Sequence, residues 1–170
     1  MITVGEIIFA RIDDRLIHGQ VMTKWVKGYN CNSIFVIDDQ LAKDEFMKNI
    51  YIMSASTANI TLKILTVDDS IKLWEKDHYD GFKVILLFKN IKTVKDTIEK
   101  GLPIKKLNIG GIAKSADRKF IIPTVSLNKE ETESLLELEE NYGVEIFFQT
   151  VPESKRVGLD AALGVFNIKR

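Results

Sequence analysis

The sequence has little cysteine, no excess of either charge and no long apolar run. Cys31 is the only cysteine, which excludes an internal disulfide and a cysteine-based metal cluster and favours a reducing compartment. Twenty-four Lys and Arg residues balance twenty-four Asp and Glu residues, so no net positive field predicts a nucleic acid partner or an anionic membrane. Any electrostatic function must therefore be local.

Two further absences concern membranes and secretion. No apolar run approaches the length of about 20 residues that spans a bilayer. The opening residues lack the basic region, apolar stretch and small-residue cleavage site of a secretion signal. The sequence therefore predicts a cytoplasmic protein.

Apolar residues make up 45% of the 170, which is enough for the buried core of one domain covering residues 1–170. Short apolar runs rich in β-formers recur along the chain, and most are continuous, as in strands covered on both faces. We predict strands at 6–12, 33–37, 61–67, 82–88, 106–109 and 144–148.

Segments with helical spacing lie between these strands. Apolar residues recur every three or four positions in three of them: Ile17, Val21, Trp25 and Tyr29; Phe46, Ile50 and Met53; Ile91, Val94, Ile98 and Leu102. In a fourth, Asn128 and Glu131 resemble a helix start, and the helix continues through Leu135, Leu138 and Tyr142 to Gly143. Alternating strands and helices predict an α/β fold, a doubly wound, mainly parallel sheet with helices on both faces.

Two segments are less regular. Residues 118–127 resemble a strand, but Pro123 cannot donate a ladder hydrogen bond, so we expect an edge or bent strand. The tail, residues 151–170, has no clear assignment. No linker divides the chain.

Ligands of such sheets sit outside the carboxyl ends of the strands. Four candidate loops follow predicted strands there: the loop from Asp13 to Gly19, the pair Asp38-Asp39, the pair Asp68-Asp69, and the pair Gly110-Gly111.

The first loop gathers the most chemistry. His18 stands at the start of a helical stripe beside Gly19, and an imidazole nitrogen can accept and release a phosphoryl group. Arg11 and Arg15 supply guanidinium donors for phosphoryl oxygens. Asp13 or Asp14 can hold the second imidazole nitrogen and set the tautomer. The alternative is a surface loop of ordinary ion pairs and a helix-capping aspartate, in which His18 has no chemistry.

The other candidates have simpler interpretations. His78 suits a helix end that Gly81 stops, and the aspartate pairs suit helix caps; Mg²⁺ binding lacks a defined ligand spacing. Gly110 and Gly111 indicate either a tight turn or a close backbone approach at which N–H groups face an anion. They match no nucleotide-binding motif. The tryptophans, Trp25 and Trp74, are expected in the core, and Cys31 as a packed apolar residue.

The segment "ARIDDRLIHGQV", followed by a tryptophan in "MTKWVK", resembles the opening of the IIB subunits of the mannose, fructose and sorbose family of the bacterial sugar phosphotransferase system. The resemblance continues in "LNIGGIA" and "GVEIFFQTVP". It implies that His18 is phosphorylated by a phosphohistidine of a IIA partner and passes the group to a sugar carried by membrane IIC and IID subunits.

The resemblance also implies roles for the loop residues. Arg15 matches the arginine beside the phosphohistidine and is expected to stabilise the phosphoryl charge. Arg11 is expected to give secondary stabilisation or loop structure, and one of the two aspartates to orient His18. Gly19, Gln20, Gly110 and Gly111 are expected to complete the pocket or a docking surface for partners. No metal and no cofactor is expected.

Three questions stay open at this point. The sugar is a hexose or an amino sugar of the mannose, fructose, sorbose or N-acetylgalactosamine type, and the oligomeric state is undetermined, with a homodimer among the alternatives. The phosphorylated imidazole nitrogen is unassigned. Competing functions are a receiver-like signalling domain phosphorylated on aspartate and a non-catalytic regulatory module of the same fold.

Overall fold

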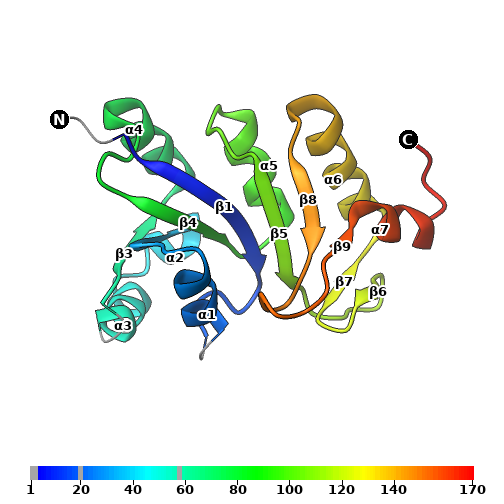
Figure 1. The fold of residues 1–170 in the computed structure, drawn as a ribbon, viewed down its shortest axis with the longest axis horizontal. Helices are drawn as coiled ribbons and strands as arrows, with labels where there is room; N and C mark the ends of the chain where they lie inside the picture. The colour runs from blue at the N-terminus through cyan, green and yellow to red at the C-terminus, as the bar shows by residue number, and fades with distance from the viewer. Residues whose placement is uncertain (1–3, 19–20, 57–58) are drawn as a thin grey trace.

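A computed structural model describes residues 4–18, 21–56 and 59–170. Its main sheet has seven strands in the order β3-β2-β4-β1-β5-β8-β9 (Figure 1). The strands are β1 (Glu6–Asp13), β2 (Ser33–Ile37), β3 (Thr61–Leu65), β4 (Lys83–Phe88), β5 (Lys106–Gly111), β8 (Glu145–Phe148) and β9 (Val157–Gly158). All neighbouring pairs are parallel except β8 and β9.

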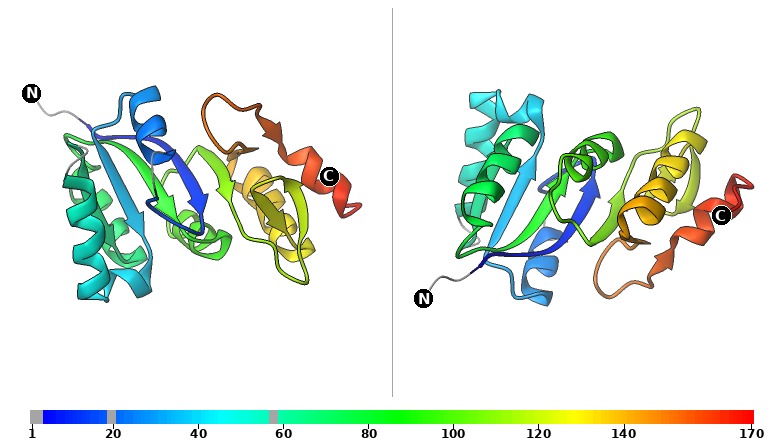
Figure 2. Two further views of the ribbon diagram at one scale, coloured as in Figure 1. Left: turned by 90° about the horizontal axis from the view of Figure 1, so that it is seen from below. Right: turned by 90° about the horizontal axis from the view of Figure 1, so that it is seen from above.

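The helices are α1 (Val21–Gly28), α2 (Asp39–Ala42), α3 (Glu45–Ser56), α4 (Val67–Asp77), α5 (Ile91–Glu99), α6 (Lys129–Tyr142) and α7 (Leu159–Val165). Two apolar clusters separate the faces of the sheet. One packs Trp25 of α1 on alternate strand residues such as Phe9, whereas the other packs α5 and α6 on residues such as Ala10. Helices therefore cover both faces (Figures 1 and 2), and the doubly wound prediction is confirmed.

Strand β1 lies at the point where the connections diverge. The connection after β1 runs through α1 to β2, which lies beyond β4. The connections after β4 and β5 run through α5 and α6 to β5 and β8, which lie on the other side of β1. The carboxyl end of β1 is therefore the switch point of the sheet, the position at which ligands bind in folds of this kind.

Several boundaries differ from the predictions. The third strand stops at Leu65, because Thr66 caps α4 by accepting a hydrogen bond from the N–H of Asp69. The structure places Ile17 before α1, so the first stripe is not one helix. The predicted edge strand at 118–127 was wrong: β6 (Lys119–Ile122) and β7 (Val125–Leu127) form a separate antiparallel hairpin, with Pro123 in its turn.

Helix α3 forms where Phe46, Ile50 and Met53 predict a helix, but these side chains face solvent. Phe46 and Met53 are 74% and 71% exposed, whereas Ala55 on the opposite side is the buried residue of the helix. Helix α6 carries the predicted capping box of Asn128 and Glu131, and Gly143 ends it with a φ of 66°. No helix in the described parts of the chain is long and apolar enough to cross a membrane.

Candidate functional site

The site begins with Arg11, whose charged side chain is buried at the carboxyl end of β1. Arg11 is 0% exposed. Its Nη1 donates to the side-chain Oδ1 of Asn108 and, at 3.2 Å, to the carbonyl oxygen of Gln149, while Nη2 donates to the carbonyl of Thr150 at 3.0 Å. The guanidinium also lies 5.2 Å from the ring centroid of Trp25. Arg11 therefore ties β1 to β5, α1 and the segment after β8.

The two glycines of "LNIGGIA" make room for this charge. A Cβ on Gly110 would stand 2.1 Å from the Arg11 guanidinium, and one on Gly111 would stand 2.8 Å from the Asp13 carboxylate. Both glycines lie in β5 rather than in the loop after it, and neither has a positive φ, so the tight-turn interpretation was wrong. The close backbone approach that the pair predicts is present, and it is made to Arg11 and Asp13.

Asp13 is the centre of the site and is also 0% exposed. Its carboxylate accepts from Nη2 of Arg11 at 3.2 Å, from Nε of Arg15 at 3.1 Å, and from the backbone N–H of Arg15 at 3.1 Å. Burial alone would raise the pKa of this carboxyl group, but the hydrogen bonds from Arg15 and His18 and the charge of Arg11 lower it. Asp13 is therefore a buried carboxylate, ionised at neutral pH.

His18 contacts the same carboxylate. Its Nε2 lies 2.9 Å from Oδ2 of Asp13, and its side chain is 20% exposed. The carboxylate can only accept, so Nε2 carries the hydrogen and Nδ1 of the neutral ring keeps its lone pair. Of the two aspartates, Asp13 and not Asp14 contacts the His18 ring in the structure.

The turn between them brings His18 back to Asp13. The N–H of Leu16 donates to the carbonyl of Asp13 at 2.9 Å, and Leu16 adopts a φ of 56°, a left-handed conformation that is costly for a leucine. Its buried side chain packs in the apolar cluster that contains Phe9 and Trp25, and this packing holds the turn in its conformation. The turn leaves Arg15 beside His18 with its side chain 52% exposed.

Asp14 has a different partner. Its Oδ2 accepts from the N–H of Ala113 at 2.7 Å, and its own N–H donates to the carbonyl of Gly111 at 2.9 Å. Asp14 therefore joins the His18 loop to the connection that follows β5. The remaining predicted residues of this loop, Gly19 and Gln20, lie outside the residues that the structure describes.

Sequence reasoning missed the second layer of the site. Asn108 anchors Arg11 and donates to the carbonyl of Gln149 at 3.1 Å, and Trp25 donates from Nε1 to the carbonyl of Thr150 at 3.3 Å. One signal was present, because Asn108 is the polar residue inside the apolar strand "KLNIGG". The sequence could not identify the backbone carbonyls of Gln149 and Thr150 as partners, since every residue has a backbone carbonyl.

The other candidates are structural. His78 ends α4 in a left-handed conformation with a φ of 51° and lies against Trp74, so His78 itself, not Gly81, terminates the helix. Asp38 caps α2, and Asp68 and Asp69 occupy the first turn of α4. Cys31 is buried, and burial raises the pKa of its thiol to about 11.

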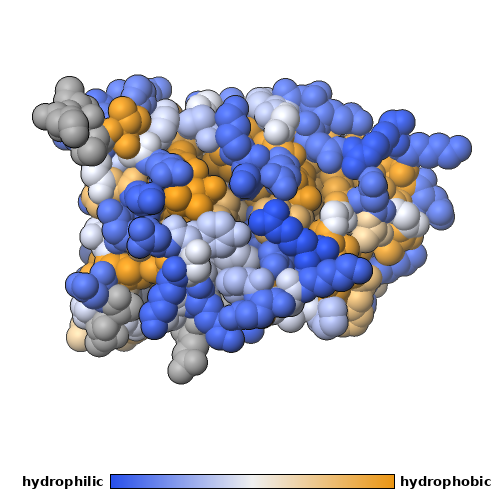
Figure 3. All heavy atoms as spheres, viewed as in Figure 1, coloured by the Kyte–Doolittle hydropathy of each residue, from blue (hydrophilic) through white to orange (hydrophobic). Residues whose placement is uncertain are grey.

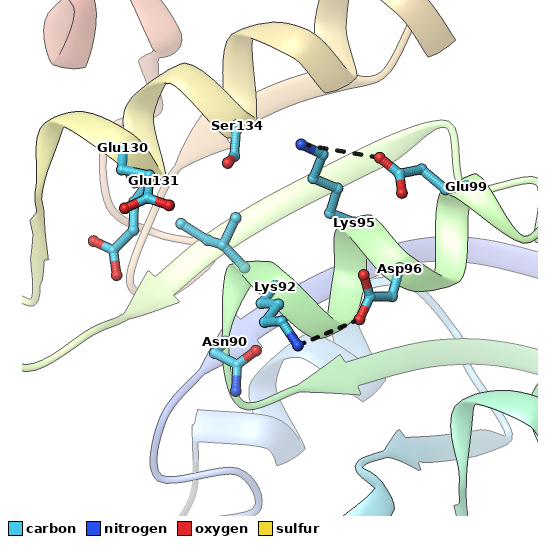
Figure 4. Close-up of a pocket in the computed structure, with 9 residues that line it drawn as sticks. Asn90, Lys92, Lys95, Asp96, Glu99, Glu130, Glu131 and Ser134 are labelled. Atoms are coloured by element: carbon cyan, nitrogen blue, oxygen red, sulfur yellow. Dashed lines mark ion pairs between the residues drawn. The ribbon is translucent and has the colours of Figure 1, made fainter.

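Two hollows lie away from the buried Arg11–Asp13 pair. One of about 380 Å³ separates α5 from α6 (Figure 4), and its lysines are paired with neighbouring acids, Lys92 with Asp96 and Lys95 with Glu99 and Glu137. Another of about 220 Å³ lies between Leu16 and the start of α3, lined in part by Asp38 and Tyr51. The space-filling view shows hydrophilic side chains over much of one face of the molecule, with apolar patches between them (Figure 3). Neither hollow gathers a nucleophile with an orienting group.

Comparison with known proteins shows the family to which the chain belongs. The model of the PTS system sorbose subfamily IIB component matches residues 7–169. The fructose-specific EIIB component of Bacillus subtilis is 34% identical over 147 residues, which cover 86% of this chain and 89% of that protein.

Solved structures are similar over nearly the whole chain. The crystal structure of manxB from Thermoanaerobacter tengcongensis is 48% identical with a TM-score of 0.87, covering 95% of this chain and 97% of that one. The IIBSor domain of the sorbose permease from Klebsiella pneumoniae is 30% identical with a TM-score of 0.85, covering 94% and 97%. The chain therefore belongs to the sorbose subfamily of IIB components, the phosphotransferase components of sugar phosphotransferase systems.

Proposed function

We propose that His18 carries the phosphoryl group, accepting it on Nδ1 from a phosphohistidine of a IIA partner and passing it to a sugar held by membrane IIC and IID subunits. The observation that supports this is the 2.9 Å contact between Nε2 of His18 and Asp13, which leaves Nδ1 as the nucleophilic nitrogen. The proposal places the chain on the cytoplasmic side of a membrane transporter.

Both transfer steps can be written with the two imidazoles, the phosphoryl group and the sugar hydroxyl, without a metal or a nucleotide. The Nδ1 lone pair attacks phosphorus as the donor N–P bond breaks, and the donor imidazole leaves with the electron pair. The phosphorylated ring keeps its Nε2 hydrogen and gains positive charge, which the Asp13 carboxylate stabilises. In the second step a sugar hydroxyl oxygen attacks phosphorus, its proton is released, and His18 regains the neutral tautomer.

Arg15 is the group we assign to the phosphoryl oxygens. Its side chain is about half exposed and next to His18, and it is held by Asp13 through Nε at 3.1 Å and Nη2 at 3.3 Å. A guanidinium in this position can bind a phosphoryl group while its place is set by the carboxylate. Because transfer of this group depends mainly on position and charge, one such arginine is sufficient to stabilise it without trapping it.

The family does not specify the sugar. Names of relatives include fructose, sorbose, mannose and N-acetylgalactosamine. We therefore propose a hexose or an amino sugar of this group as the final acceptor, selected by the membrane subunits.

The test follows radioactive phosphate from phosphoenolpyruvate through purified general components and a cognate IIA. We expect wild type to be labelled, His18→Gln to be unlabelled, and His78→Gln, which changes the other histidine of the chain, to be labelled like wild type. The linkage should be labile in acid and stable in alkali. Label on His18→Gln, or label lost in alkali as from an acyl phosphate, would contradict the proposal and favour an aspartate acceptor.

A further inference from the structure

The loop after β5 is held on both sides of one residue, Ala113. Its N–H donates to Oδ2 of Asp14 at 2.7 Å, as described above, and its carbonyl accepts from Nη1 of Arg118 at 3.1 Å. Asp14 belongs to the His18 loop, whereas Arg118 stands at the start of the β6–β7 hairpin. Ala113 is therefore the point where these two parts of the molecule meet.

Arg118 is itself fixed by the start of α6. Its Nε lies 3.2 Å from both carboxylate oxygens of Glu131, and its Nη2 lies 2.6 Å from Oε1. The two side chains are only 27% and 20% exposed, so this forked pair is sheltered from solvent. The contact with Glu131 raises the pKa of Arg118.

Glu131 has little freedom to move. It is the third residue of α6, and its Oε2 accepts from the N–H of Asn128 at 2.9 Å while its own N–H donates to Oδ1 of Asn128 at 2.7 Å. Asn128 in turn donates from Nδ2 to Asp117, which directly precedes Arg118 in the loop that begins with Ala113. The helix cap therefore fixes the end of this loop through Asp117 and Arg118.

We propose that Arg118 is a positioning residue for phosphoryl transfer at His18. It fixes Ala113 from the carbonyl side, so that Ala113 can hold Asp14, and Asp14 stands between Asp13 and Arg15 in the chain. The proposal rests on His18 being the phosphorylated residue. Arg118 touches neither His18 nor Asp13; it acts through Ala113 and Asp14 on the angle at which the His18 loop leaves β1.

The proposal has a physical reason in the geometry of transfer. In-line transfer depends on placing the nucleophile, the phosphorus and the charged donors together, and a displacement of about 1 Å costs on the order of 100-fold in rate. Asp14 is fixed by its backbone, through Gly111, and by its side chain, through Ala113. Loss of Arg118 keeps the hydrogen bond between Asp14 and Gly111 but weakens the one between Asp14 and Ala113. The His18 loop then shifts while it stays attached to β5.

The test compares Arg118→Gln with Arg170→Gln. Arg170 also pairs with an acid of α6, Glu139, but at the opposite end of that helix. We measure single-turnover transfer from phosphorylated IIA to His18 at several IIA concentrations, and we correct each rate for the folded fraction from urea unfolding. Arg118→Gln should lower the maximal rate about 10-fold or more, with little change in the IIA concentration at half-maximal rate. Arg170→Gln should transfer at the wild-type rate.

A second readout separates positioning from stability. The imidazole ¹⁵N resonances of His18 report its contact with Asp13 in the folded protein, and they should shift in Arg118→Gln but not in Arg170→Gln. Should Arg118→Gln fail to fold, Arg118→Lys replaces it, because lysine keeps the charge but has one nitrogen in place of the three with which Arg118 reaches Ala113 and Glu131. Equal corrected rates and unchanged resonances would refute the positioning role. Absence of label on the wild-type protein would instead refute the function of His18.

Discussion

Arg11 and Arg15 donate to the same carboxylate from opposite environments. Arg11 is fully buried, whereas the side chain of Arg15 is 52% exposed. Arg11 also donates to Asn108 and to two backbone carbonyls, but among the described residues Arg15 donates to Asp13 alone. Burial and the number of partners, not residue type, thus separate the arginine fixed inside the site from the half-exposed one to which we assign phosphoryl binding.

Replacing Arg11 should have the largest effect on stability. Arg11→Met removes the buried cation and leaves Oδ1 of Asn108 and one side of the buried Asp13 carboxylate without a donor, whereas the two carbonyls keep donors in Asn108 and Trp25. We expect the free energy of unfolding to fall by about 3–5 kcal/mol. Urea unfolding measures this loss. A loss below about 1 kcal/mol, the range of exposed ion pairs, would show that Arg11 does not hold the site together.

Arg15 should show the converse pattern. Arg15→Met should leave the free energy of unfolding within about 1 kcal/mol of wild type, because the pair is partly solvated. Single-turnover transfer to His18 should slow by about 10²–10³-fold, as when one charge-stabilising donor is lost from a reacting centre. A variant that unfolds but transfers normally would reverse the roles assigned to the two arginines.

The glycines of β5 provide a further test of how Arg11 is held in the site. Gly110→Ala would press on the Arg11 guanidinium, so we expect a loss of about 1–3 kcal/mol in urea unfolding. Gly111→Ala meets Asp13 at a longer distance and should cost less. In an Arg11→Ala background the cost of Gly110→Ala should largely disappear; an unchanged cost would show that the strain lies elsewhere.

The smallest expected effect is on the free energy of unfolding at low pH. The pKa of Asp13 is lowered in the folded protein, so its stabilisation is present above the unfolded value of about 3.9 and is lost as pH falls through the lower folded value. Arg15→Met removes one cause of that lowering. Its unfolding free energy, measured from pH 7 downward, should therefore fall by less than in wild type and level off at a higher pH, while the onset near the unfolded value is unchanged. Identical acid limbs would show that Arg15 does not stabilise this charge.

Periodicity predicted the fold better than it predicted the direction of side chains. Continuous apolar runs placed six strands correctly because both faces of a parallel sheet are covered. The same reasoning does not distinguish an apolar stripe that packs from one that faces solvent, as Phe46 and Met53 on α3 show. The hairpin at β6 and β7 escaped prediction because a Pro-Thr turn inside one apolar run looks like a bend.

The site was predicted as a set of residues but not as an arrangement. The spacing of Arg11, Asp13, Arg15 and His18 predicted an anion site, yet it did not show which arginine is buried or which aspartate meets the imidazole. Both answers depend on β5 and on the segment after β8, which lie about 100 or more residues further along the chain. Contacts of that separation are set by the packed sheet and leave no local pattern.

Trp25 offers one more consequence. Its ring lies over Arg11, and its indole N–H reaches the carbonyl of Thr150, whereas the other tryptophan, Trp74, packs against His78 and Tyr79 on the opposite side of the sheet. Replacing Trp74 with phenylalanine would therefore leave Trp25, beside the buried guanidinium, as the single tryptophan of the chain. The protein thus contains its own optical probe, able to follow rearrangement of the charged centre in real time without an attached label.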